Sequence, residues 1–250
     1  MIVGLFLFAS SQTFIFEITK PSTLAQQKCG DYDTSASRGA GAAYAWCKPA
    51  LEKYSRSNNV ALSFGVWSWD QWSRTLTNSY FIKTALFDCF AEKSMFESFA
   101  KGYVLPYQRY NVCLGPALSN TNNHLFLDWK STLQLIDPIH TAEPSLIVKF
   151  DIEGSEWEVL ETMSDAHLAK ILLFDLEIHF CIPKHGSKRG NDYMLRIQRQ
   201  LLRLDRVFYV AQRFADGPLI FPVCLTDPSV KLSGTTMMSI SYINKAFVNQ

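Results

Sequence analysis

The sequence lacks the patterns that mark several common protein classes. Its 250 residues include six cysteines but no Cys-x-x-Cys pair, which argues against a structural zinc site. It also lacks Gly-x-Gly-x-x-Gly, the usual fingerprint of a dinucleotide-dependent oxidoreductase. Neither charge is in excess, because 24 Lys and Arg face 23 Asp and Glu. Nucleic-acid binders need clustered positive charge to neutralise phosphates, so we expect no nucleic-acid partner.

The N-terminus also lacks features of a clear targeting segment. Residues 1–10 are apolar and residues 9–11 are small, as at a signal-peptide cleavage site, but the first basic residue is Lys20. The apolar run is shorter than the roughly 20 residues of a membrane-spanning helix, and no Asn-x-Ser/Thr sequon occurs. We expect residues 1–19 to be a signal peptide or an anchor, with an ordinary N-terminus left open. The expected location is the secretory pathway or the extracellular space, with the cytoplasm as the alternative, and only the N-terminus could associate with a membrane.

The cysteines are spread along the chain and allow one pairing if the protein is secreted. Cys29 and Cys47 flank the start of the folded region and could form a disulfide in an oxidising compartment. Cys89 and Cys113 lie in apolar runs and are expected to be buried thiols that pack as small hydrophobic side chains.

Composition predicts a folded domain with a large core, since 48% of the residues are hydrophobic and 14% are aromatic. Residues 20–50 are expected to be a loosely packed lead-in, and residues 51–250 a single domain. Apolar runs predict strands over 60–66, 83–90, 108–114, 145–152, 170–178, 206–214 and 237–248. Helices are expected over 68–80, 128–136, 156–163 and 192–204.

The order and character of these segments predict an α/β fold. The strands up to residue 178 are continuous apolar runs, which are typical of strands covered on both faces. Strands alternate with helices, so the sheet should be mostly parallel, with helices on both faces. The last two strands have only a loop-like segment between them, and we expect them to form an antiparallel hairpin at one edge.

Three strand ends carry polar residues where ligands bind in open α/β sheets. Gly65 follows the first strand, where a glycine lets the backbone approach a ligand, although a tight turn without a ligand is an equal alternative. Asp88 follows the second strand, 23 positions later, where a carboxylate can hold ribose hydroxyls; an ordinary loop carboxylate is the alternative. Asp151 and Glu153 end a buried strand and share one face, which Lys149 also occupies. Glu156 and Glu158 are better explained by the positive N-terminus of the next helix.

The third of these strand ends resembles a known family. Lys149–Leu160, KFDIEGSEWEVL, resembles the K-x-D-[IV]-E-G-[AS]-E signature of FkbM-type and related methyltransferase-like proteins. Lys170–Phe180, KILLFDLEIHF, is similar to a strand that these families follow with E-x-H. Ala61–Asp70 and Met238–Lys245 are similar to the first-strand turn and the C-terminal strand of the animal methyltransferase-like branch. The resemblance implies a class I, S-adenosylmethionine-dependent methyltransferase fold: a Rossmann-like seven-stranded sheet with a reversed final strand.

The resemblance implies roles for the residues of the first two strand ends. Ser63 and Gly65 would face the methionine part of S-adenosylmethionine, and Asp88 would hold its ribose. We therefore expect a side chain at Gly65 to block the cofactor. The first turn departs from the usual acidic, glycine-rich loop, because Trp67 and Trp69 follow the single glycine. Large side chains there could fill part of the cleft, which motivates an alternative in which the domain is an inactive binding module.

Four residues are candidates for the chemistry of methyl transfer. The resemblance places Asp151 and Glu153 beside the transferred methyl group. Glu177 and His179 share one face of the fifth strand, as a substrate contact and a base, although a lone histidine here is more often simply buried. These four side chains could also surround a divalent cation, but no ligand spacing requires it, so we expect no metal. The acceptor is expected to be a small molecule, a glycan or a protein side chain, and the oligomeric state cannot be read from the sequence.

Overall fold

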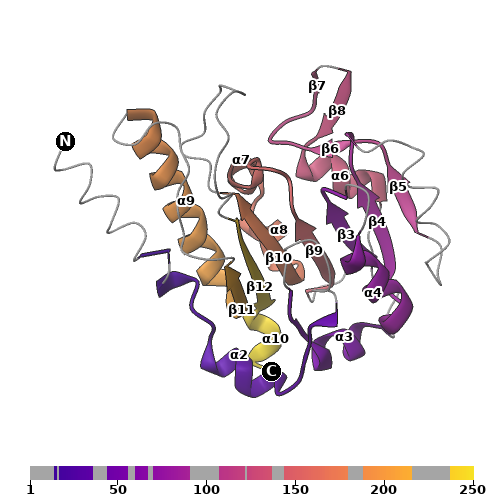
Figure 1. Cartoon of the computed structure of the whole chain (residues 1–250), viewed down its shortest axis with the longest axis vertical. Helices are drawn as coiled ribbons and strands as arrows, with labels where there is room; N and C mark the ends of the chain where they lie inside the picture. The colour runs from indigo at the N-terminus through magenta and orange to yellow at the C-terminus, as the bar shows by residue number, and fades with distance from the viewer. Residues whose placement is uncertain are drawn as a thin grey trace.

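The computed structural model describes residues 14–15, 17–35, 44–55, 60–66, 70–90, 107–121, 123–136, 144–179, 188–215 and 237–250. A seven-stranded sheet lies at the centre, with helices on both of its faces (Figure 1). The helices are α2 (Thr23–Cys29), α3 (Lys48–Ser55), α4 (Gln71–Tyr80), α6 (Trp129–Ile136), α7 (Glu156–Thr162), α8 (Asp165–Ala169), α9 (Lys188–Val207) and α10 (Lys245–Val248).

The strands form three sheets. The central one has the strand order β11-β12-β10-β9-β3-β4-β5. Its strands, in that order, are β11 (Phe208–Ala215), β12 (Met237–Asn244), β10 (Ile171–His179), β9 (Leu146–Phe150), β3 (Val60–Phe64), β4 (Lys83–Phe87) and β5 (Gln108–Tyr110). A three-stranded sheet holds β6 (Cys113–Leu114), β8 (His124–Leu127) and β7 (Ser119–Thr121). β1 (Tyr32–Asp33) pairs with β2 (Trp46–Cys47).

The central sheet confirms the predicted α/β fold class. Strands β3, β4, β5, β9 and β10 pair in parallel, whereas β12 runs antiparallel to both β10 and β11. The final strand is therefore the reversed one, and it lies inside the sheet with β11 at the edge. Strands β3 and β9 are direct neighbours, so the first and third of the polar strand ends meet.

Alternate side chains of each central strand enter two separate cores. Leu62 and Val148 pack in a core with residues of α7 and α9, whereas Ala61 and Ile147 pack in a core with residues of α3 and α4. Because successive strand residues point to opposite faces, a strand covered on both sides must be apolar throughout. This explains the continuous apolar runs and places the polar residues at the strand ends.

Several of the predicted strands are shorter than the sequence suggests, and the runs 108–114 and 237–248 show why. The run 108–114 divides between β5 and β6, which belong to different sheets, because the chain turns at Asn111. The run 237–248 ends as a strand at Asn244, whose side chain accepts a hydrogen bond from the Ala246 amide and caps helix α10. An apolar run does not reveal where a strand changes sheet or gives way to a helix.

The described part of the lead-in is more tightly packed than the sequence predicts. Trp46 and Ala50 are fully buried against the sheet. A disulfide joins Cys29 to Cys47, as considered for a secreted protein. A second disulfide joins Cys89 to Cys113, so the expectation of two buried thiols there was wrong. Within the described stretches, no helix is long and apolar enough to cross a membrane.

Candidate active site

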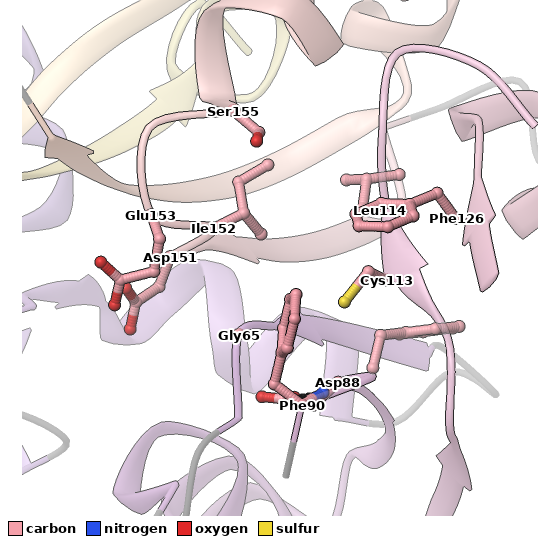
Figure 2. A pocket seen from close by; sticks show the side chains of 11 residues that line it. Gly65, Asp88, Phe90, Cys113, Leu114, Phe126, Asp151, Ile152, Glu153 and Ser155 are labelled. Carbon is pink, nitrogen blue, oxygen red and sulfur yellow. Dashed lines mark hydrogen bonds between the residues drawn. The ribbon is translucent and has the colours of Figure 1, made fainter. Parts of the chain in front are cut away.

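A cavity of about 490 Å³ opens at the carboxyl ends of β3, β4 and β9 (Figure 2). This is the position that open α/β sheets use for ligands, and the volume suits a small molecule. Asp151 and Glu153 lie on one side of the cavity, and Leu114 and Phe126 lie across from them. The lining residues are Gly65, Phe87, Asp88, Phe90, Cys113, Leu114, Phe126, Asp151, Ile152, Glu153 and Ser155.

Gly65 forms the turn after β3 and lines the cavity, as predicted. The direction in which a side chain would extend from it, however, is occupied by protein. Its φ is +78°, a conformation that residues with a side chain rarely adopt. A Cβ built on it would lie 1.6 Å from the backbone oxygen of Asp151. The expectation that a side chain at Gly65 would chiefly block the cofactor was therefore wrong: it would first collide with the end of β9.

Asp88 and Ser63, the two other predicted cofactor contacts, are placed differently. Asp88 is buried at the end of β4 and lines the cavity, and its Oδ1 accepts a 2.7 Å hydrogen bond from the Phe90 amide. Ser63 lies inside β3, fully buried, and does not line the cavity. Its hydroxyl has no hydrogen-bond partner among the described residues. The structure thus brings Gly65 and Asp88, but not Ser63, to the cavity.

Asp151 and Glu153 lie at the cavity edge, as predicted. Asp151 Oδ2 is 3.1 Å from the buried ammonium of Lys149, which partly neutralises this strand end. Burial opposes the charge of Lys149, but the carboxylates of Asp151 and Asp70 outweigh burial and raise its pKa above the usual value. Glu153 is in a left-handed turn (φ +55°), with a side chain that is 85% exposed. Asp151 is therefore a fixed group, and Glu153 is open to solvent.

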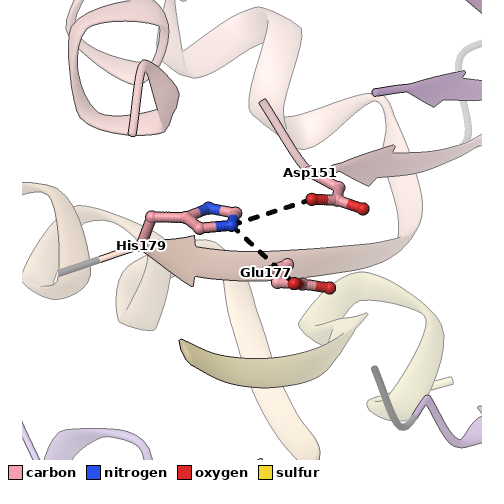
Figure 3. A group of neighbouring side chains, drawn as sticks. All are labelled: Asp151, Glu177 and His179. Carbon is pink, nitrogen blue, oxygen red and sulfur yellow. Dashed lines mark ion pairs between the residues drawn. The ribbon is translucent and has the colours of Figure 1, made fainter. Parts of the chain in front are cut away.

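The predicted pair on β10 joins this acidic edge. His179 and Glu177 point from β10 toward Asp151 on the neighbouring strand (Figure 3). His179 Nε2 is 3.9 Å from Asp151 Oδ1, 3.8 Å from Glu177 Oε1 and 3.5 Å from Glu153 Oε2. We call these four residues the acidic–histidine cluster. All four were predicted from the sequence, and all four lie together.

The carboxylates around the cluster shift the pKa values of Glu177 and His179. Burial and the nearby Asp151 carboxylate raise the pKa of Glu177 to about 7. Burial disfavours the charged form of His179, but the carboxylates of Glu156, Glu153 and Asp151 outweigh it and raise the pKa of His179 to about 9. Strongly perturbed pKa values like these two are typical of functional sites.

Glu156 is a functional neighbour that the sequence interpretation missed. Its side chain is fully buried, and its Oε1 accepts hydrogen bonds from the amides of Ile152 and Gly154, each at 3.2 Å. The same oxygen is 2.9 Å from His179 Nδ1. Glu156 thus supports the turn before its helix and also orients the imidazole. The helix-start explanation was incomplete for Glu156, while Glu158 is a partly exposed partner of Arg196.

Two buried groups from the N-terminal segment also reach β10, and no local sequence pattern indicates them. The Tyr44 hydroxyl donates to Glu177 Oε2 at 3.3 Å. The indole of Trp46 donates to Asp175 Oδ2 at 2.6 Å, as does the indole of Trp72. Burial raises the pKa of Asp175 to about 6, against the effect of its hydrogen-bond donors. Trp67 and Trp69, which the sequence suggested might fill the cleft, lie outside the described residues.

The comparisons with known proteins find similarity among solved structures alone. No family model matches it, and no curated protein does. Among solved structures, an rRNA methylase from Streptococcus thermophilus is 10% identical over 78% of this chain and 92% of its own, with a TM-score of 0.37. Precorrin-6y C5,15-methyltransferase from Geobacter metallireducens is 13% identical over 78% and 87%, with a TM-score of 0.35.

A third solved structure is 1,6-didemethyltoxoflavin-N1-methyltransferase from Burkholderia thailandensis, with 1,6-didemethyltoxoflavin and S-adenosylhomocysteine bound. It is 10% identical over 79% of this chain and 77% of its own, with a TM-score of 0.32. Likeness at these values is too low to transfer a substrate or a site residue to this chain. The fold itself is established by the sheet order: this is a Rossmann-like α/β protein with a reversed final strand.

Proposed function

We propose that this protein is an S-adenosylmethionine-dependent methyltransferase of the FkbM type, acting on a small-molecule, glycan or protein acceptor. The observation that carries the proposal is the cavity at the ends of β3, β4 and β9, with Gly65, Asp88 and Asp151 in its wall. The resemblance of Lys149–Leu160 to the FkbM-type signature supports it, because that segment forms one side of this cavity.

The residues present fit the cofactor. Asp88 offers a buried carboxylate at the cavity wall, which suits a ribose diol because one carboxylate accepts two hydrogen bonds. Phe87, Phe90, Leu114 and Phe126 supply apolar surface suited to a flat adenine ring. Gly65 keeps β3 and β9 close enough to form a single floor.

The acidic–histidine cluster lies where an acceptor would approach. When bound, S-adenosylmethionine supplies an electrophilic methyl group on sulfur. The residues of the cluster would hold the acceptor so that its lone pair faces that methyl carbon, with the sulfur as the leaving group. The acceptor proton passes to Asp151, Glu153 or His179, which act as the base, and Glu177 contacts the acceptor. Positioning of the two reactants supplies much of the remaining rate.

Calorimetry with S-adenosylmethionine and S-adenosylhomocysteine, in buffer with a chelator, tests the proposal. We expect Asp88→Ala to weaken binding about 5- to 150-fold, the equivalent of roughly 1–3 kcal/mol for a lost buried hydrogen-bond acceptor. Asp128→Ala is the matched control: Asp128 Oδ1 also accepts a 2.7 Å bond from a backbone amide, that of Ser131, but the residue does not line the cavity.

Three results would separate the alternatives. No binding by the wild-type protein at about 1 mM of either ligand would overturn the methyltransferase proposal. Equal losses in Asp88→Ala and Asp128→Ala would remove Asp88 from the site. Binding without methyl transfer to any tested hydroxyl, amine or glycan acceptor would favour the inactive binding module.

We also infer that the protein folds in the secretory pathway or outside the cell. All four cysteines in the described residues are in disulfides, and such bonds persist in oxidising compartments. Mass spectrometry of non-reduced peptides from cells that secrete the protein tests this, because free thiols at Cys89 and Cys113 would contradict it.

A further inference from the structure

Asp151, Glu177 and His179 each have one polar atom that is held by a fixed partner. Lys149 occupies Oδ2 of Asp151, and the Tyr44 hydroxyl donates to Oε2 of Glu177. Glu156 holds Nδ1 of His179 at 2.9 Å. In each case the other atom, Oδ1, Oε1 or Nε2, faces the middle of the cluster, as Figure 3 shows for the three side chains. One ligand atom from each of Asp151, Glu177 and His179 lies within 4.8 Å of the others.

The spacing of these atoms is too long for hydrogen bonds and close to that of ligands sharing a cation. His179 Nε2 is buried and has no hydrogen-bond partner in the described part of the chain, although three carboxylate oxygens lie 3.5–3.9 Å away. Nitrogen–oxygen hydrogen bonds require about 2.7–3.2 Å. Two ligands at about 2.1–2.4 Å from one cation lie about 3.0–3.9 Å apart, depending on the coordination geometry.

The surroundings of His179 are those of a metal-bound histidine. Such histidines donate a hydrogen bond from the N–H of their second ring nitrogen to a carboxylate, which fixes the ring orientation and its tautomer. Glu156 provides this carboxylate, and it is itself fixed by the amides of Ile152 and Gly154. This arrangement directs Nε2 toward Asp151, Glu153 and Glu177. Lys149 is the one cation that contacts the cluster in the described residues, so the carboxylates outnumber the positive charge.

We propose that Asp151, Glu177 and His179 bind a divalent cation, with Glu153 as an additional ligand from the solvent side. The mixture of carboxylate oxygens and one imidazole nitrogen favours Mn²⁺ or Zn²⁺ over Mg²⁺ and Ca²⁺, which prefer oxygen alone. This departs from the sequence-based expectation of no metal, since only the fold shows the free ligand atoms facing one another. Glu156 is a positioning residue in this site.

The proposed cation also indicates the chemical class of the methyl acceptor, an inference that rests on the proposed function. A bound divalent cation lowers the pKa of a coordinated hydroxyl, so the acceptor class is an alcohol or phenol. The hydroxyl proton passes to water beside the exposed Glu153, and the resulting oxygen attacks the methyl carbon as the carbon–sulfur bond breaks. His179 then acts as a ligand instead of a base.

Calorimetric titration of Mn²⁺, Zn²⁺ and Mg²⁺ into chelator-treated full-length protein, without S-adenosylmethionine, tests the cation site. We expect one Mn²⁺ or Zn²⁺ per chain and weaker binding of Mg²⁺. Loss of a carboxylate that orients a ligand costs about 10- to 100-fold in metal affinity, so Glu156→Gln should fall in that range. His179→Ala and Glu177→Gln should lose about 100-fold or more, because each removes a ligand.

Two controls keep the outcome decisive. Glu158→Gln and His167→Gln change the same residue types on α7 and α8, outside the cluster, and should bind like the wild-type protein. Glu177→Gln is isosteric and keeps an acceptor for Tyr44, so it remains informative if His179→Ala fails to fold. No Mn²⁺ or Zn²⁺ binding by the wild-type protein at about 1 mM, or equal binding by the cluster and control variants, overturns the proposal. Cation binding without S-adenosylmethionine binding would leave this site intact and remove only the methyltransferase.

Discussion

Replacing Gly65 with alanine tests how the turn after β3 holds the cavity floor. The new Cβ would lie 1.6 Å from the Asp151 backbone oxygen, so the two segments must separate by about 1.4 Å to reach 3.0 Å, the shortest approach that real Cβ atoms show. The positive φ adds about 1–2 kcal/mol of strain, and overpacking typically costs a further 1–3 kcal/mol. We therefore expect a loss of about 2–5 kcal/mol in the free energy of unfolding.

Gly154→Ala is the matched control for this substitution. Gly154 also has a positive φ, +99°, but a Cβ there would meet no heavy atom within 4 Å. It should lose only the strain, about 1–2 kcal/mol, so Gly65→Ala should melt lower than Gly154→Ala by roughly 2–12 °C. Urea unfolding and thermal melting followed by circular dichroism measure both variants. Equal losses would refute the contact between Gly65 and β9 as the reason for the glycine.

Three further predictions concern buried contacts. Asp175→Ala leaves two indole N–H groups and a serine hydroxyl without their acceptor, so it should cost about 3 kcal/mol or more in urea unfolding, whereas Asp175→Asn should cost less; equal small losses would contradict this. Replacing Cys89 and Cys113 together with serine should lower stability by about 3 kcal/mol, the value for a closed loop of 24 residues, and a reductant that leaves the wild-type melting curve unchanged would contradict it. Mn²⁺ at 100 times its dissociation constant should stabilise the protein by about 2.7 kcal/mol, reversibly with a chelator; an equal gain in Glu177→Gln would place the cation elsewhere.

The strand framework and the acidic–histidine cluster were both accessible from the sequence. Apolar runs of five to nine residues identify buried strands, and Asp88 and Asp151 mark the ends of β4 and β9. Because parallel strands end at the same edge, Asp151, Glu177 and His179 had to converge once β9 and β10 became neighbours. The spacing of two residues between Glu177 and His179 then put both side chains on one face.

Two groups that hold this cluster in place, Tyr44 and Glu156, could not be predicted, because their partners lie in other segments of the chain. Tyr44 precedes Glu177 by 133 positions, and Glu156 precedes His179 by 23. The Cys89–Cys113 bond depends on the chain path between β4 and β6, and cysteine pairings cannot be deduced from spacing alone. Ser63 was expected at the cavity because it lies near Gly65, but it precedes the turn and stays inside the strand.

The hydrogen bond from Trp46 to Asp175 has a consequence for the order in which the protein folds during synthesis. The two residues are 129 positions apart, so at about 5–20 residues per second the tryptophan is added to the chain roughly 6–26 s before its acceptor. The Cys29–Cys47 bond closes entirely within the early segment and can form during this interval. Oxidation would then keep the segment that carries Trp46 beside the end of α2 until β10 is translated. Synthesis under reducing conditions prevents the Cys29–Cys47 bond near the N-terminus. The resulting delay should nevertheless appear at the last stage of folding, when β10 joins the sheet.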